Sequence, residues 1–387
     1  MNRSIDRWTR RYVATSAVGF ACWRIGVLLG ADHGVEVAAA LLGFVLPVVF
    51  GKAYLLIPSF AGRTLASASV PAVHLPLAAG GAIALVGARA GLTPRVVGVA
   101  GSAAWTLGVV LFLGGLLWTV GPELTRFERW GSGEDRWSAR FALPFVGVAL
   151  TYLLVGTAGL LAATTDGAVG TDPRTTHLFA AGTAGLLIVA LGTRLLPGFC
   201  SADPPTAVVA VTLPAAAVGP GMLAVHLWGG ADFRLAAATQ AVGLLGWAVI
   251  VGTLFFRTSR SFVGFYGIAA GAAFGAVGAG LGVGMATRAG PLAALRTAHV
   301  DAMLAGFLSL TVVGFVLLFY PHTDGKFPGS DAAATAVVAA LAAGVALQVL
   351  GPLLGGDPVT GVLSGMGDGL AALGATGFAA VVAVRLF

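Results

Sequence analysis

The sequence predicts an all-α membrane protein of about twelve transmembrane helices, arranged as three pseudo-repeats of four. Three observations carry this prediction: the composition, the number of long apolar segments, and a recurring pattern of Gly, Pro and polar residues. Of 387 residues, 57% are hydrophobic and only 10% are charged, whereas soluble domains carry about 25% charged residues. Sixteen acids and 22 bases are too few to solvate the surface of a soluble chain of this size, so apolar side chains must face lipid.

Twelve segments have the length and composition of a membrane-spanning helix, which needs about 20 mostly apolar residues. In chain order we expect helices at 12–30, 34–58, 72–92, 97–121, 140–164, 176–197, 206–228, 233–256, 262–286, 293–320, 332–353 and 360–385. The breaks between them are charged or rich in Gly and Pro. The longest polar stretch, 122–140, is too short for a soluble domain, so 1–387 is expected to form one integral membrane domain.

The net charge of +6 is explained by membrane topology, because the basic residues are scattered between apolar segments. With the N-terminus inside, fourteen of the 22 basic residues lie on that side and six on the other. This bias predicts a multi-pass protein of the cytoplasmic membrane with both termini in the cytoplasm. The lipid bilayer is the expected partner, and nucleic acid is not.

An internal repeat divides the helices into groups of four. The segments 36–58 and 299–321 match without gaps at nine of 23 positions, including Gly43/Gly306, Gly51/Gly314 and Pro58/Pro321. A third copy at 177–199 keeps the leading His, a Gly fifteen residues later and a closing Pro. These segments are the second, sixth and tenth helices. The sequence therefore predicts pseudo-repeats at about 12–121, 140–256 and 262–386.

Each repeated helix begins with a polar residue at the outer end, namely Glu36, His177 and His299. The glycines that follow return to the same helix face and form a groove, which admits either a neighbouring helix or a flat cofactor. Ionisable residues inside a membrane mark function by default, and neutral imidazole is an axial ligand for haem iron. Four of the six histidines are expected near the outer face: His33, His177, His226 and His299.

The remaining two histidines, His74 and His322, are expected at the inner face as hydrated interfacial residues. Arg24 interrupts an apolar segment, and an ion pair with Glu36 on the next helix would explain both charges without a cofactor. Asp301 and Asp368 lie in the outer third of their helices, where proton relay, cation binding and packing against polar donors are alternatives.

The pattern resembles subunit I of the haem-copper oxidases: twelve helices in three groups of four, with histidines on helices two, six and ten. Two segments are also similar to helices of the NnrS family, membrane haem proteins associated with nitric oxide metabolism. The first is His177, Gly182, Gly185 and Arg194, and the second is His299-x-Asp301-x-Met303-Leu304-x-Gly306-Phe307. The architecture covers the whole chain, whereas these motifs cover about seventy residues.

The resemblance implies one haem of b-type, with His299 as first ligand and His177 or His33 opposite. It implies that Arg24 and Arg296, together with Arg174 and Arg234, pair with haem propionates, the alternative being that loop arginines are solvated. Any metal site would draw on His299, His177 and His226. Copper is the metal in question, but the histidine pair that binds it in the oxidases is absent. Glu36 stands at the equivalent of one haem ligand, and Asp301 at another, so a complete oxygen-reducing centre is not expected.

The resemblance therefore implies a haem protein with a redox or nitric-oxide-related role, served by other respiratory subunits or a small electron carrier. Two other classes stay open. A secondary transporter or channel fits the internal repeat and the intramembrane acids. A cofactor-less scaffold of a respiratory complex fits the missing ligands. Bound haem would separate the first class from the other two.

Overall fold

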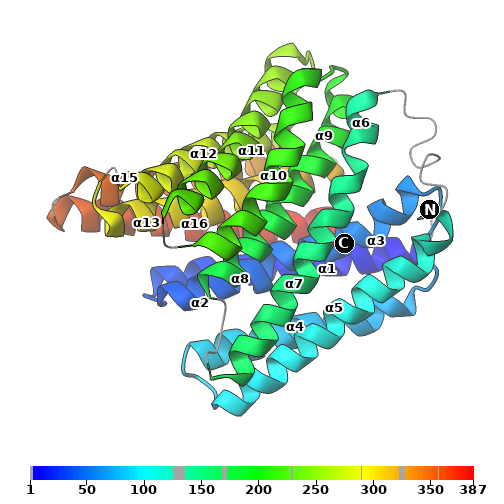
Figure 1. Ribbon diagram of the computed structural model, residues 1–387, viewed down its shortest axis with the longest axis horizontal. Coiled ribbons are helices and arrows are strands. Elements are labelled where there is room, and N and C mark those ends of the chain that lie inside the picture. The colour runs from blue at the N-terminus through cyan, green and yellow to red at the C-terminus, as the bar shows by residue number, and fades with distance from the viewer. Residues whose placement is uncertain are drawn as a thin grey trace.

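A computed structural model describes residues 3–124, 136–167, 172–227, 230–288, 290–321, 327–355 and 357–387, and within these ranges every regular element is a helix. Eleven of the described helices are long and apolar enough to cross a membrane, and α1 (Arg3–Leu28) is a further long helix. The chain is therefore an all-helical, multi-pass membrane protein (Figure 1).

Three of the long helices are composite, because a π-helical stretch joins two α-helical parts. The first central helix consists of α2 (His33–Ala38), η1 (Ala39–Val45) and α3 (Leu46–Phe60). The second consists of α8 (Pro173–His177), η3 (Leu178–Gly185) and α9 (Leu186–Cys200). The third consists of α13 (Leu292–Val300), η4 (Asp301–Leu310) and α14 (Thr311–Phe319). The sequence did not indicate these π stretches, which start one to three residues after Glu36, His177 and His299.

The other elements are simple helices. In chain order they are α4 (Ser69–Arg89), α5 (Arg95–Leu124), α6 (Trp137–Phe141) with α7 (Leu143–Thr165), α10 (Thr206–His226), α11 (Gly230–Arg257), α12 (Val263–Thr287), α15 (Asp331–Leu354) and α16 (Asp357–Leu386). α1 begins nine residues before the predicted start of the first helix. The ion pair between Asp6 and Arg10 (3.0 Å), one helical turn apart, stabilises this polar extension.

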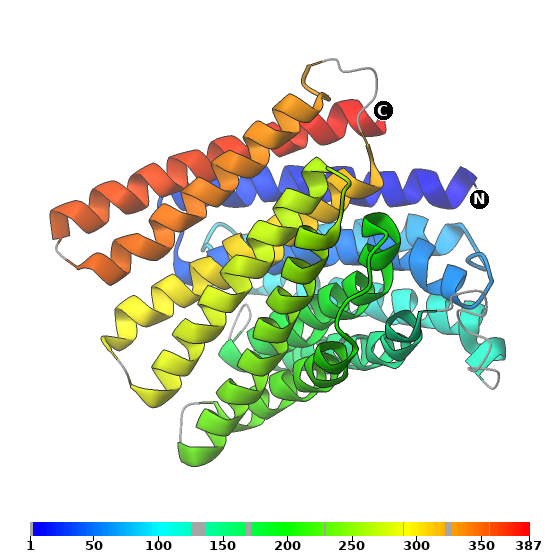
Figure 2. The same cartoon turned by 90° about the horizontal axis from the view of Figure 1, so that it is seen from above.

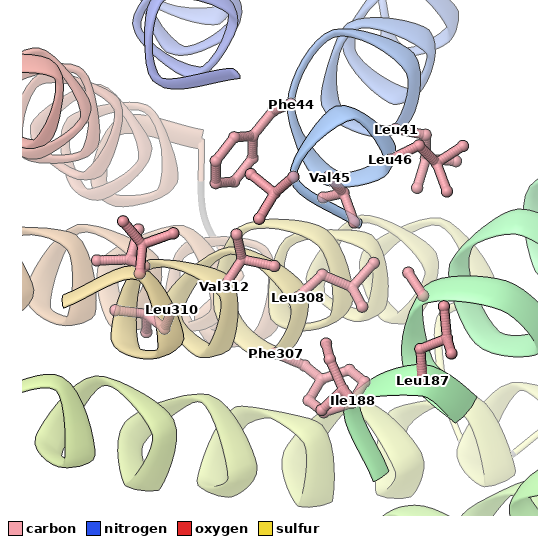
Figure 3. Packing of buried hydrophobic residues seen from close by; sticks show 14 of the residues in the cluster. Leu41, Phe44, Val45, Leu46, Leu187, Ile188, Phe307, Leu308, Leu310 and Val312 are labelled. Atoms are coloured by element: carbon pink, nitrogen blue, oxygen red, sulfur yellow. The ribbon is translucent and has the colours of Figure 1, made fainter. Parts of the chain in front are cut away.

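The three central helices form the core of the molecule. Between 72% and 83% of their most apolar stretches is buried, against at most 50% for the other membrane-crossing helices. Their π stretches contact one another in all three pairings. Figure 3 shows how side chains such as Val45, Leu187 and Leu308 fill this junction. The segments with the Gly, Pro and polar pattern are therefore the ones that the fold buries most deeply.

The remaining helices surround this core in a repeating order of contacts. α1, α7 and α12 each pack against one central helix, and α4/α5, α10/α11 and α15/α16 each form a close antiparallel pair. Contacts of α5 with α7, α11 with α12 and α16 with α1 link the three sets. Figure 2 shows the last of these, where the first helix in blue lies beside the last in red.

Small residues allow these helices to approach closely. In α4/α5 a methyl group on Gly81 would lie 2.8 Å from the carbonyl oxygen of Gly101, and in α15/α16 one on Gly344 would lie 2.8 Å from that of Gly367. Within lipid there is little hydrophobic drive for helices to associate, so such close backbone packing is a main source of stability.

The chain direction places the polar heads of the central helices together. Both termini lie at one end of the bundle (Figure 2), and α1 crosses to the other end before the first central helix begins at His33. Since each later helix crosses back, the second and third central helices also start there. We call this the histidine end, and the opposite one the terminus end.

Candidate functional site

A cavity of about 900 Å³ lies at the histidine end, among the heads of the three central helices. His33, His177 and His299 all line it, one from each central helix. Its body is mostly apolar, with Leu223, Leu244 and Met303 among the lining residues. The volume falls in the range of about 300–1,000 Å³ that is typical of small-molecule and cofactor sites.

His299 is held by the neighbouring helix α12. Its Nδ1 lies 2.8 Å from the backbone oxygen of Gly278. A carbonyl oxygen only accepts, so Nδ1 carries the proton and donates it, and Nε2 keeps its lone pair. A methyl group on Gly282 would lie 3.2 Å from Cε1 of the ring, so the glycine allows the imidazole to pack closely against α12. Histidines that bind a metal through one ring nitrogen usually donate a hydrogen bond from the other to a carbonyl or carboxylate oxygen in this way.

His177 has the same arrangement within its own helix. Its Nδ1 lies 2.7 Å from the backbone oxygen of Pro173 and therefore donates to it. Asp172 caps this turn by accepting hydrogen bonds from the amides of Arg174 and Thr175 at 2.7 and 3.0 Å. His177 and His299 are close enough to interact electrostatically. The cavity thus receives two imidazoles, each with Nε2 available.

His33 differs from the other two histidines in its partner. Its Nδ1 lies 3.5 Å from Oε2 of Glu36, and 44% of its side chain is exposed. Asp32 caps the helix at this point by accepting hydrogen bonds from the amides of Gly34 and Val35. His33, and not Glu36, therefore takes the position in the cavity wall that His177 and His299 take in the other two central helices.

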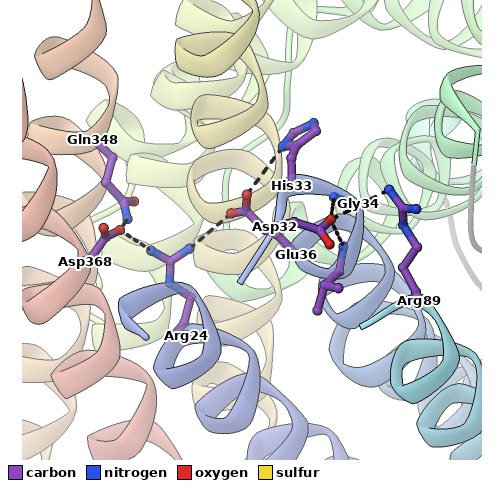
Figure 4. Close-up of polar contacts among 9 residues, drawn as sticks. Arg24, Asp32, His33, Gly34, Glu36, Arg89, Gln348 and Asp368 are labelled. Atoms are coloured by element: carbon purple, nitrogen blue, oxygen red, sulfur yellow. Dashed lines mark hydrogen bonds and ion pairs between the residues drawn. The ribbon is translucent and has the colours of Figure 1, made fainter. Parts of the chain in front are cut away.

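Glu36 belongs to a buried ionic network around Arg24, shown in Figure 4. Arg24 is fully buried, and its guanidinium lies 3.7 Å from Glu36 and 3.6 Å from Asp368 of α16. Gln348 of α15 donates a hydrogen bond to Asp368. The expected ion pair between Arg24 and Glu36 is therefore present. Arg24 does not line the cavity, so the structure gives the predicted propionate role of Arg24 no support.

Arginines at the mouth of the cavity come from three elements. Arg296 lines it as the sequence suggested, but Arg174 and Arg234 are not among the described lining residues. Arg89, at the end of α4, and Arg288, just after α12, take part instead. Arg89 lies 3.7 Å from Asp32 and packs over Gly34 (Figure 4). Sequence reasoning missed both because only their positions at helix ends, shared with many loop arginines, could have indicated them.

His226 stands apart from the other three histidines of this end. It is not among the described residues that line the cavity, and its Nδ1 lies 3.8 Å from Asp232. Among the described residues, no group of three or more His, Cys, Asp or Glu side chains has metal-binding spacing. The structure thus brings His299 and His177 together, but it does not bring His226 to them.

The expectation that His74 is a hydrated interfacial residue is wrong. Its side chain is fully buried, and its Nδ1 shares a 2.9 Å hydrogen bond with the hydroxyl of Tyr54. Phe50 and Phe112 enclose the ring, with centroids at 4.7 and 5.5 Å. Aromatic side chains from α3 and α5 thus exclude water at a depth where the sequence suggested an interface. The other histidine expected there, His322, lies outside the described residues.

The arrangement suits a flat, largely apolar molecule that carries a metal at its centre and anionic groups at its edge. Two imidazoles offer free nitrogens, apolar side chains enclose the body, and arginines lie at the mouth. Haem has this combination of properties, so the residues present fit the group. Comparison with known proteins finds no matching family model and no similar curated protein.

Proposed function

We propose that this chain is a haem-binding membrane protein related to subunit I of the haem-copper oxidases and to the NnrS family. One observation carries the proposal: three histidines from three separate central helices meet at one cavity. A chance distribution of six histidines over 387 residues does not favour that convergence. Histidine is the residue expected where a protein binds haem iron.

His299 and His177 are the proposed axial ligands. Each has Nδ1 tied to a backbone carbonyl, which presents Nε2 to the cavity. Arg296, Arg288 and Arg89 are proposed to pair with the carboxylates at the edge of the haem. When bound, haem supplies one-electron redox chemistry and binding of small gases. We therefore propose a redox or nitric-oxide-related role, without a complete copper–haem centre for oxygen reduction.

The recurring order of helix contacts supports a threefold pseudo-repeat as part of the same proposal. In each group of four, the first helix packs on the second, the third pairs with the fourth, and the fourth contacts the next group. The π stretches begin at nearly the same position in all three central helices. π-Helical turns often occur at functional sites, and here they lie directly beneath the cavity-lining histidines.

We further propose that the terminus end faces the cytoplasm, as the distribution of basic residues favours. The cavity then opens on the outer side, where a small electron carrier or another respiratory subunit has access to it. Reporter fusions at both termini, one active only in the cytoplasm and one only outside, test this orientation. Activity of the outside reporter at either terminus would contradict it.

The absorption spectrum of the detergent-solubilised protein, produced in a haem-replete membrane, tests haem binding. We expect a Soret band that falls strongly in His299→Ala and in His177→Ala. His226→Ala is the matched control, because it removes an imidazole from the same end of the bundle but from outside the cavity, and it should keep the band. A colourless native protein, or equal bands in all three variants, would refute the proposal.

A further inference from the structure

The Arg24 network contains more acid than base and lies beside the cavity. It comprises Arg24, Glu36, Asp368 and Gln348, and Asp301 interacts electrostatically with its charged members. Two carboxylates, Glu36 and Asp368, therefore lie against one guanidinium. The guanidinium is completely buried, and none of its three nitrogens makes a hydrogen bond to any described residue. Its contacts are ionic, at 3.6–3.7 Å, beyond hydrogen-bonding distance.

Two connections join this network to the proposed haem site. Glu36 lies 3.5 Å from His33, whose ring is part of the cavity wall. Asp301 follows His299 by two residues on the third central helix. The network also joins the two ends of the chain, because Arg24 belongs to the first helix and Asp368 to the last, which packs beside it (Figure 4).

Resting on the proposed haem function, we propose that the Arg24 network stabilises the oxidised state of the bound haem. Oxidation adds one positive charge to the iron. A neighbouring group with more carboxylates than cations attracts that charge. Surrounding charge and burial are known means by which proteins set haem potentials. The network touches neither His177 nor His299, so its role is to set the charge near the iron and not to ligate it.

This inference is tested by the midpoint potential of the haem in the full-length protein, measured from the Soret and visible bands. The direction in which each variant shifts the potential decides the question. Asp368→Asn and Glu36→Gln each remove a negative charge and should raise the potential. Arg24→Gln removes the positive charge and should lower it, and the double variant Arg24→Gln/Asp368→Asn should return toward the native value. Asp203→Asn is the matched control, because it breaks an Asp–Arg pair at the terminus end and should change nothing.

If Arg24→Gln does not fold, the two carboxylate variants still decide the question. A raised potential in both, with the control unchanged, supports the role of the network. An unchanged or lowered potential in Asp368→Asn, with an intact Soret band, overturns this inference and leaves the proposed haem function standing. A native protein without a Soret band overturns the proposed function, and this inference with it.

Discussion

Close packing of α12 on the third central helix makes Gly271 a sensitive position. A methyl group there would lie 2.9 Å from the amide nitrogen of Thr311 and 3.1 Å from the carbonyl oxygen of Phe307. Ordinary contacts lie at 3.4–4 Å, so the two helices would have to separate by about 0.5 Å or more. Because both atoms belong to the backbone, a change of side-chain rotamer cannot relieve the contact.

The expected cost of Gly271→Ala follows from a comparison with Gly280→Ala on the same helix. A methyl group on Gly280 would meet nothing within 4 Å. Both variants gain the same helix propensity, about 0.5–1 kcal/mol, so their difference isolates the steric effect. Overpacking costs about 1–3 kcal/mol, and we expect the free energy of unfolding of Gly271→Ala to be lower than that of Gly280→Ala by this amount.

This difference is measured by unfolding the detergent-solubilised variants with increasing mole fractions of dodecyl sulfate. Circular dichroism monitors the loss of helix. Equal free energies of unfolding for the two variants would refute the reasoning, since the contact would then have to relax without cost. A loss of stability in Gly280→Ala alone would refute it as well, because that position faces open space.

Two further predictions concern the histidines. Gly282→Leu should displace the imidazole of His299 and reduce the haem content per protein, whereas Gly280→Leu, two residues away, should retain the native haem content. Absorption at the Soret band measures the haem content of both variants. Equal haem content in the two would count against His299 as a ligand. Tyr54→Phe should lower the free energy of unfolding by about 1–3 kcal/mol, because it leaves Nδ1 of the buried His74 without its hydrogen bond. A native-like unfolding curve for Tyr54→Phe would contradict a stabilising role for the hydrogen bond between Tyr54 and His74.

The helices of this protein could be predicted from sequence because each depends on a local property. A membrane-crossing helix needs a run of apolar residues long enough to span the bilayer, and breaks in such runs are visible in the chain itself. The same holds for the segments headed by Glu36, His177 and His299, where a polar residue precedes regularly spaced glycines. Their burial follows, since helices rich in small residues pack closely with neighbours.

The pairing of Arg24 with Glu36 was predictable for a different reason. A charge in the middle of an apolar segment needs a partner, and Glu36 is an acid within the next predicted helix. The second partner, Asp368, was not predictable. It is 344 residues away in the chain and meets Arg24 only because α16 packs against α1.

The sequence therefore predicts a multi-pass helical protein, the order of its helices and three related segments, which the structure places in the core. Apart from the pairing of Arg24 with Glu36, the packing of the helices decides which polar side chains meet. It placed His33 in the cavity wall and Glu36 in the network, buried His74 among aromatic rings, and brought Arg89 and Arg288 to the cavity mouth. The physical reason is that apolarity and helix length act within a segment. A cavity or an ion pair depends instead on the rotation and packing of helices that are distant in the chain.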